Sequence, residues 1–164
     1  GICGSGLIDA AAVFLRNGLI DSSGMIKDPG GFIELADGIR LNQNDIVQFQ
    51  LAKGAVRAGI CMLFDKSGAS PQDLSRVCLA GAMGNYINVR NAVYTGIIPD
   101  AAEMTVPVGN ASLTGAEMFL FEFGSPGPSS SAEAAEYIEL SNEPRFQEYF
   151  MDKMVFRDAE RGKA

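Results

Sequence analysis

The chain has 164 residues, 47% of them apolar, and its 13 basic and 20 acidic side chains give a formal net charge of −7. This length is enough for one unit with a buried core, and the acidic balance argues against a nucleic-acid-binding protein, which needs a basic face. No apolar run reaches the roughly 18 to 20 residues of a membrane span and no signal-peptide pattern is present, so we expect no membrane insertion.

The cysteine and histidine content narrows the chemistry further. Cys3, Cys61 and Cys78 form no Cys-x-x-Cys pair, so we expect this chain to hold neither zinc nor an iron–sulfur cluster. Their small, odd number fits a cytoplasmic protein with reduced thiols, and we expect Cys78 to pack inside an apolar strand. Histidine is absent, which excludes Ser-His-Asp and Cys-His catalysis.

Periodicity and turn signals in the first half of the chain predict a helix to about residue 17, strands at 32–35 and 39–41, and a helix at 42–66. Gly18 ends the first helix, Asp37-Gly38 is a hairpin turn between the strands, and Asn42 caps the second helix. Because the chain opens at Gly1 directly on a glycine turn, we expect a fragment of a longer protein.

The second half predicts further elements in this order: a helical turn from 70, a strand at 76–80, a helix at 88–94, a strand at 104–108, a helix at 111–121, a flexible Gly/Pro/Ser loop at 124–131, a helix at 132–136, a strand at 137–140, a helix at 143–153, a strand at 154–156 and a tail at 157–164. The strand at 76–80 lacks polar alternation, so we expect both of its faces to be covered. The alternation of helix and strand predicts an α/β domain.

A glycine turn follows the strand at 76–80 and consists of Gly81, Ala82, Met83, Gly84 and Asn85. Glycine lets backbone approach a ligand closely because it has no Cβ, and ligands of open α/β sheets bind at the carboxyl ends of strands. The local pattern fits equally well a tight strand-to-helix turn without a ligand, because Gly-x-x-Gly alone is weak evidence.

The long helix carries a lysine where its apolar stripe should continue. The stripe consists of Ile46, Phe49, Val56, Ile60 and Leu63. Lys53 falls within it, and an ammonium in a buried stripe is costly unless it is paired or drawn toward a ligand. Gln50 and Arg57 lie on the same face, so the three side chains could clamp an adenine or ribose. The alternative is a lysine that packs its stem and exposes its head; we favour the ligand.

Two further turns precede predicted helices. Gly4-Ser5-Gly6 could bind an anion through backbone N–H groups and the helix dipole, but a plain helix start capped by Ser5 or Gly6 is favoured unless other phosphate loops converge there. Gly109-Asn110 carries the same ambiguity, and a structural turn is favoured. No acidic pair has the spacing of a metal site, and no catalytic residue stands out.

Taken in order, these motifs resemble one family: the C-terminal, actin-like ATPase domain of RACo and its relatives, the reductive activators of corrinoid proteins. The resemblance runs from Gly1 to about Phe156 and rests on the segments 1–9, 50–53, 57–59, 79–87, 96–100, 108–111 and 146–150. It implies a ribonuclease H-like subdomain with a mixed sheet and flanking helices, in which 1–123 is the nucleotide side and 132–156 belongs to the same domain.

The resemblance also implies a function. Full-length members carry an N-terminal [2Fe-2S] ferredoxin domain and use ATP with Mg²⁺ to drive reduction of an inactive Co(II) corrinoid to Co(I) on a partner corrinoid protein. By carry-over, Gly81 to Asn85 would be the adenosine loop, the helix of Gln50, Lys53 and Arg57 the adenine side, and Gly4 to Gly6 the phosphate side.

The chain departs from the family pattern in two respects. Met83 stands where relatives are expected to have an aromatic residue, and the ferredoxin part and the first half of the ATPase domain are missing. We therefore expect this chain alone to bind no cofactor and to be inactive. Alternatives are a scaffold that docks the corrinoid protein or forms a homodimer, and half of a sugar or acyl kinase, which is disfavoured because no substrate-activating acid is visible.

Overall fold

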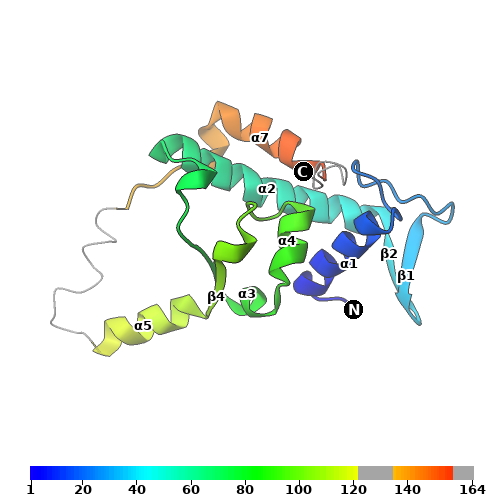
Figure 1. Cartoon of the computed structure of the whole chain (residues 1–164), viewed down its shortest axis with the longest axis horizontal. Coiled ribbons are helices and arrows are strands. Elements are labelled where there is room, and N and C mark those ends of the chain that lie inside the picture. Colours follow the sequence, from blue (N-terminus) through cyan, green and yellow to red (C-terminus); the bar gives the residue numbers. More distant parts are fainter. Residues whose placement is uncertain (122–134, 157–164) are drawn as a thin grey trace.

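A computed structural model of the chain describes residues 1–121 and 135–156 (Figure 1). The helices and strands, in chain order, are α1 (Gly4–Arg16), β1 (Phe32–Ala36), β2 (Ile39–Asn42), α2 (Gln43–Ser67), β3 (Val77–Ala80), α3 (Ala82–Tyr86), α4 (Val89–Thr95), β4 (Thr105–Gly109), α5 (Ala111–Phe121) and α7 (Pro144–Met154). Short 3₁₀ turns lie at Pro71–Asp73, Ala102–Met104 and Leu140–Asn142. No helix among the described residues is both long and apolar enough to cross a membrane.

Local signals place most of these elements where the sequence predicts them. Asn42 and Asp45 form a reciprocal capping box at the start of α2: the Asp45 N–H donates to Asn42 Oδ1 at 3.1 Å, and the Asn42 N–H donates to Asp45 Oδ2 at 2.8 Å. Gly18, at φ +64°, follows the last turn of α1. The hairpin turns at Gly38, also at positive φ.

The described strands form two separate pairs. β1 and β2 are antiparallel, with Phe32 opposite Asn42, and β3 and β4 are parallel, with Val77 opposite Thr105. The expectation that β3 is covered on both faces is wrong for the described chain. Cys78 and Ala80 are exposed, because successive side chains of a strand point to opposite faces and Leu79, on the other face, is the one that packs against the core.

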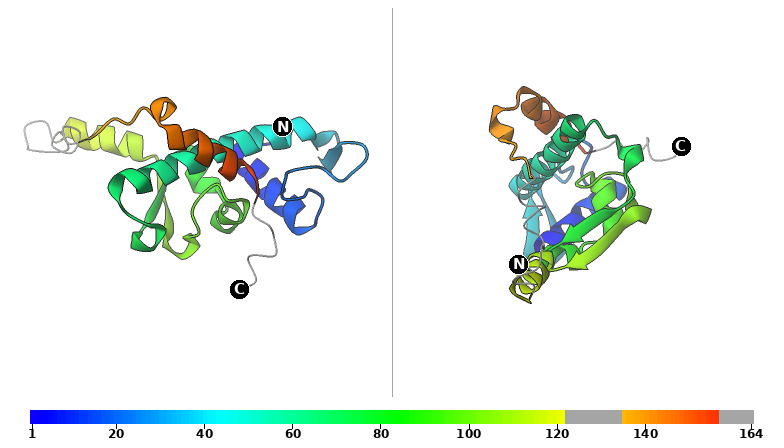
Figure 2. Two further views of the ribbon diagram at one scale, coloured as in Figure 1. Left: turned by 90° about the horizontal axis from the view of Figure 1, so that it is seen from above. Right: turned by 90° about the vertical axis from the view of Figure 1, so that its left-hand side faces the viewer.

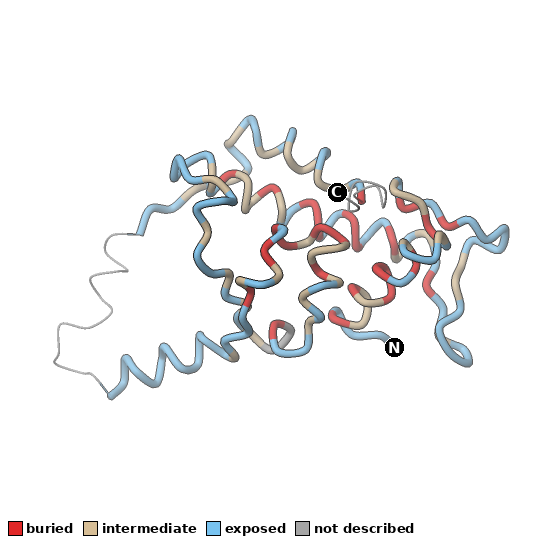
Figure 3. The backbone as a smooth tube through the Cα atoms, viewed as in Figure 1, coloured by how far each residue is buried: buried red, intermediate tan, exposed pale blue. Residues whose placement is uncertain are grey.

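One apolar core joins α1, α4, β2 and the first half of α2 (Figure 3). Its most buried members are Ile8, Ala11, Phe14, Ile20, Ile46 and Ala92. Phe156 completes this core from the far end of the chain: its ring stacks on Phe49 at a centroid distance of 6.0 Å, and its N–H donates to the carbonyl of Ser22 at 2.9 Å. The C-terminal end of the described chain is therefore fixed to the N-terminal half.

The long helix α2 buries a face that differs from the predicted stripe. Ile46 and Phe49 are buried, but Val56 is 47% and Leu63 is 59% exposed. The reason is α7, which packs against the face of Gly54, where the missing side chain lets the backbone of Phe150 and Met154 come close. The second half of the predicted stripe lies away from α7.

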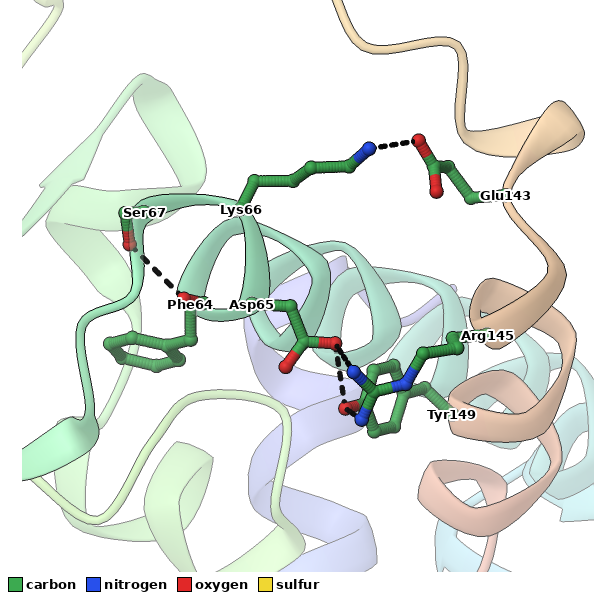
Figure 4. Close-up of polar contacts among 7 residues, drawn as sticks. All are labelled: Phe64, Asp65, Lys66, Ser67, Glu143, Arg145 and Tyr149. Atoms are coloured by element: carbon green, nitrogen blue, oxygen red, sulfur yellow. Dashed lines mark hydrogen bonds and ion pairs between the residues drawn. The ribbon is translucent and has the colours of Figure 1, made fainter.

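The C-terminal region corrects several predictions. There is no strand at 137–140, where an extended segment leads into a 3₁₀ turn, and none at 154–156, because α7 runs through Met154. Residues 135 and 136 are not helical; the rest of the predicted helix at 132–136, the loop at 124–131 and the tail at 157–164 lie outside the described residues. At the C-terminal end of α2, Lys66 pairs with Glu143 and Asp65 pairs with Arg145, and these ion pairs hold the start of α7 (Figure 4).

Candidate functional site

The turn between β3 and α3 has a backbone conformation that only glycine adopts readily. Gly81 has φ +88° and ψ 171°, a region essentially restricted to glycine and concentrated at functional sites. A Cβ built on Gly81 would meet no atom within 4 Å, so the space beside its backbone is open. At Gly84, in contrast, a Cβ would lie 2.8 Å from the carbonyl oxygen of Leu79. Gly84 therefore permits α3 to fold back tightly on β3, while Gly81 faces open space.

The end of β4 lies directly beside this turn. The N–H of Gly81 donates to the carbonyl of Gly109 at 2.7 Å. Gly109 also has positive φ, +71°, and open space where a Cβ would stand. The strand register shifts between Leu79 and Ala80, just before the two glycines meet, and such irregularities are common next to functional sites. Two bare backbone turns thus meet at the carboxyl edge of the parallel pair, where α/β sheets bind ligands.

Residues 4–6 form the first turn of α1. The cap is neither Ser5 nor Gly6, as the sequence favoured, but Cys3, whose Sγ accepts the Gly6 N–H at 3.4 Å. The hydrogen bond with the Ser5 hydroxyl, at 3.2 Å, and the Gly6 N–H lower the pKa of the Cys3 thiol. Ser5 itself is buried. Figure 1 shows the N-terminal end of α1 directed toward α3, and the two helices are in contact.

Gln50 and Lys53 are occupied by a different part of the chain. The Lys53 side chain is 2% exposed, and its ammonium donates to the carbonyls of Lys153 and, at 2.9 Å, Val155. It also lies 5.2 Å from the ring centroid of Phe156, in a cation–π arrangement. These contacts satisfy the buried charge, which the sequence interpreted as a sign of a ligand.

Gln50 contributes to the same junction, the set of contacts between α2 and the C-terminal end of α7. Its amide nitrogen donates to the carbonyls of Ser23 at 2.9 Å and Met154 at 3.3 Å. Arg57 lies half-buried, one turn beyond Lys53 on α2. The side chains of α2 that the sequence assigned to a nucleotide therefore include two that hold the C-terminal end of α7.

The predicted site residues thus fall into two groups. Gly81 to Asn85 and the first turn of α1 lie on one side of α2, whereas Gln50 and Lys53 lie at α7 on the other; Figures 1 and 2 show α7 and α3 on opposite sides of that helix. The sequence missed the pairing of Gly81 with Gly109. A signal was present, because parallel strands bring their carboxyl ends to one edge and both strands end in glycine.

The described residues offer no obvious metal ligands. No three Cys, Asp or Glu side chains in residues 1–121 and 135–156 gather closely enough to hold a metal ion. All three cysteines lie in these ranges as free thiols, Cys3 and Cys78 exposed and Cys61 half-buried. Asp9, one of the scattered acids, accepts a hydrogen bond from the Asn91 amide at 2.6 Å, which joins α1 to α4.

Comparison with known proteins identifies relatives of the chain. The chain is 32% identical to the corrinoid activation enzyme RamQ of Eubacterium limosum, over 96% of the chain and 31% of that protein. It is 35% identical to the [Co(II) methylated amine-specific corrinoid protein] reductase of Methanosarcina barkeri, over 74% of the chain and 22% of that protein. A solved reductive activator for corrinoid, iron–sulfur protein superposes with a TM-score of 0.79 at 30% identity, over 96% of this chain and 28% of its own.

The chain therefore spans about a third or less of the length of these relatives. A family model described as the C-terminal domain of RACo, the ASKHA domain, matches residues 1–163. ASKHA domains are the actin-like ATPase domains, so the predicted fold class and the predicted family are both confirmed. This chain belongs to the family of RACo C-terminal ASKHA domains.

Proposed function

We propose that the chain is part of a longer, ATP-dependent reductive activator of corrinoid proteins, called the full-length protein below, and that it contributes the adenosine side of the nucleotide site. The observation that carries the proposal is Gly81, whose glycine-only conformation and open side face the carboxyl edge of β3 and β4. Gly81, Ala82, Met83, Gly84 and Asn85 would follow the base and ribose with their backbone.

The remaining predicted contacts with the nucleotide differ in how well the positions of their side chains support them. Gly4, Ser5 and Gly6 are proposed for the phosphate side, supported by the contact between α1 and α3. Arg57 remains a prediction. Gln50 and Lys53 already donate to carbonyls of Ser23, Met154, Lys153 and Val155, so we propose that they act on α7 first and on a nucleotide only through it.

The role of the whole protein follows from its relatives. Their names describe corrinoid activation and reduction, so the proposed partner is a corrinoid protein, and the proposed reaction takes its cobalt from Co(II) to Co(I). Bound ATP would supply the free energy by favouring one arrangement of the complex over another. We place the residues that would hold Mg²⁺ and the [2Fe-2S] cluster in other parts of the full-length protein, and we place that protein in the cytoplasm; no three metal-ligating side chains gather among the described residues of this chain.

The adenosine loop is tested with two alanine variants of the full-length protein. Gly81→Ala forces a side chain into a glycine-only region at a cost of about 1–3 kcal/mol and fills the open side. Gly31→Ala is the matched control, because Gly31 also has positive φ, +69°, and open space but lies in the loop before β1. Titration calorimetry with ADP should show affinity reduced at least about tenfold for Gly81→Ala, a loss of 1.4 kcal/mol, and unchanged for Gly31→Ala. Equal affinities in the two variants would contradict an adenosine site here.

The activation role needs a separate assay. The full-length protein is mixed with a Co(II) corrinoid protein, a reductant and ATP, and the visible spectrum is followed. Co(I) should appear only with ATP. If Co(I) forms equally well without it, the chain serves as a docking or dimerisation scaffold, the second candidate function. Transfer of the γ-phosphoryl group of ATP to a small molecule, leaving ADP, would instead indicate a kinase.

A further inference from the structure

A hydrogen bond between Asp9 and Asn91 joins the two parts of the chain that carry the proposed nucleotide contacts. Asn91 Nδ2 donates to Asp9 Oδ1 at 2.6 Å, and both side chains are half-buried. Asp9 belongs to α1, whose first turn is proposed for the phosphate side, and Asn91 belongs to α4, which follows the adenosine loop in the chain. Hydrogen bonds to a carboxylate are short and about twice as strong as those between neutral groups. The pair therefore holds the two proposed sides of the site to each other.

Asp9 lies close to the first turn of α1. Ser5 and Gly6 precede it by four and three positions, so the three residues lie along one side of the helix. Ile8, beside Asp9, is 2% exposed and belongs to the core, so α1 cannot turn about its axis without unpacking that core. A shift of Asp9 is consequently a shift of the N–H groups at the start of the helix.

Asn91 is connected to the adenosine loop by short links. Its backbone N–H donates to Oδ1 of Asn88, the N-cap of α4, at 3.2 Å, and Asn88 stands two positions after the end of α3. Leu79 and Ile87, one on each side of the loop, pack against the core. Figure 1 shows α3 beside the ends at which α1 and α4 begin. The loop is thus fixed at both of its ends and, through Asn88, to the residue that binds Asp9.

A second contact between α1 and α4 lies at their other ends. The guanidinium of Arg16 lies over the ring of Tyr94, 4.4 Å from its centroid. Arg16 is the last residue of α1, about 18 Å along the helix axis from Gly4. This cation–π contact stabilises the packing of the same two helices, but it involves residues that are not proposed for the nucleotide. It offers a control for any substitution that merely weakens the contact between α1 and α4.

We propose that Asp9 and Asn91 are positioning residues, which align the phosphate side of the nucleotide site with its adenosine side. This inference rests on the proposed nucleotide site. A ligand that reaches both sides binds as two linked parts, and its affinity depends on their alignment. Adenosine, which has no phosphate, needs the adenosine loop alone. Loss of the pair should therefore weaken ADP binding and spare adenosine, whereas a general loss of stability would weaken both ligands.

Two alanine variants of the full-length protein separate alignment from stability. Asn91→Ala removes the donor to Asp9 and keeps the backbone N–H that Asn88 accepts. Tyr94→Ala is the matched control, because Tyr94 is also half-buried on α4 and also contacts α1. ADP binding is measured by titration calorimetry and adenosine binding by ligand-observed NMR.

The two variants should differ in their preference between the ligands. Asn91→Ala should lower the affinity for ADP at least about tenfold and leave that for adenosine unchanged. Tyr94→Ala should leave both affinities unchanged, even if it lowers the melting temperature further. An equal ratio of ADP to adenosine affinity in the two variants overturns the positioning role.

An exchange of the two side chains provides a rescue test. Asn91→Asp sets a second carboxylate against Asp9, and like charges repel; α4 itself tolerates the change, because an acid in the first turn of a helix is favourable. Adding Asp9→Asn restores the hydrogen bond with donor and acceptor exchanged. ADP affinity should fall in Asn91→Asp and return in the double variant. A double variant that stays weak overturns the proposal.

Two further outcomes are distinct. Asp9→Asn alone can still accept from Asn91, so it should keep ADP affinity; if it loses that affinity, the carboxylate of Asp9 acts on the ligand directly and the positioning role is wrong. If ADP affinity responds to Gly81→Ala but not to Asn91→Ala, the positioning role is wrong while the adenosine site stands. If ADP affinity responds to neither, the adenosine site is wrong as well.

Discussion

Two helices of equal length in the C-terminal half of the chain, α7 and α5, differ in the contacts they make with the rest of the described chain. α7 is joined to α2 by the buried Lys53, by Gln50, and by a cluster of Asp65, Arg145 and Tyr149. Two residues after the end of α7, Phe156 enters the core. Each residue of α5 is exposed. The difference teaches that, among the described residues, α7 has partners on α2 whereas α5 has none that bury it.

The same contrast separates the candidate nucleotide site from the contacts between α2 and α7. The adenosine loop lies next to the uncovered region, at the edge where β3 and β4 end, and the contacts of α7 lie across α2 from it. Substitutions at the α2–α7 junction should therefore change the docking of α7 and leave the Gly81 turn intact. Each prediction below measures that docking by hydrogen exchange of the α7 amides in the full-length protein.

The largest effect is expected at Lys53. Lys53→Ala leaves the carbonyls of Lys153 and Val155 without this donor and opens a cavity at a side chain that is 2% exposed. The free energy of opening α7 should fall by about 3 kcal/mol. Lys53→Met keeps the length of the side chain but not its N–H groups, so its loss should be intermediate. Weakened ADP binding with unchanged exchange of α7 would show that Lys53 serves the nucleotide directly.

A smaller effect is expected at the glycines of α2. A Cβ on Gly54 would lie 2.7 Å from Met154 Cγ and 3.1 Å from the carbonyl oxygen of Phe150, so Gly54→Ala should destabilise the docking of α7 by about 1–3 kcal/mol. Gly59, on the same helix, offers the matched control. Its Cβ would make an ordinary contact with Leu140 at 3.8 Å, so Gly59→Ala should stabilise α2 by about 0.5–1 kcal/mol. The same sign for both substitutions would argue against close packing at Gly54.

The smallest effect is expected at Tyr149 and depends on pH. The Tyr149 hydroxyl donates to Asp65 at 2.8 Å, and this hydrogen bond raises the pKa of Tyr149 (Figure 4). The folded state therefore holds the proton more tightly than the unfolded state. Its contribution is complete below the unfolded pKa, about 10, and is lost as the pH rises through the higher folded value.

Tyr149→Phe removes this contribution, because the ring remains and the hydroxyl does not. The α7 amides of the variant should be less protected than those of the parent by a constant amount between pH 7 and 9, and this difference should shrink as the pH rises above 10. Arg145 contacts the same carboxylate of Asp65 at 2.8 Å and is unchanged in the variant. Equal protection in parent and variant between pH 7 and 9 would show that the hydroxyl does not stabilise the contact between α2 and α7.

Much of the fold was predictable because its signals are local. Asn42 with Asp45, Asp37-Gly38 and Gly18 each act on residues a few positions away, and the structure places them as expected. The failures came from distant partners. Lys53 signalled a buried charge correctly, but its acceptors lie 100 and 102 residues further along the chain, so the sequence could not distinguish a ligand from the end of α7.

The candidate site was predictable in part for the same reason. The turn at Gly81 could be recognised from a strand followed by glycines, but its conformation and its hydrogen bond to Gly109 depend on how β3 and β4 align. The predicted burial of Cys78 failed because an apolar strand is covered only where another element lies over it.

The sequence by itself determined where most of the described helices and strands begin and end, where the glycine turns fall and which family the chain resembles, because caps, turns and motif order are properties of neighbouring residues. Only the tertiary structure decided that Lys53 holds α7, that Gly81 meets Gly109, and that α5 and one face of β3 are exposed in the part of the chain that the structure describes. Those outcomes depend on burial and on hydrogen-bond partners far apart in the chain, which local patterns do not specify.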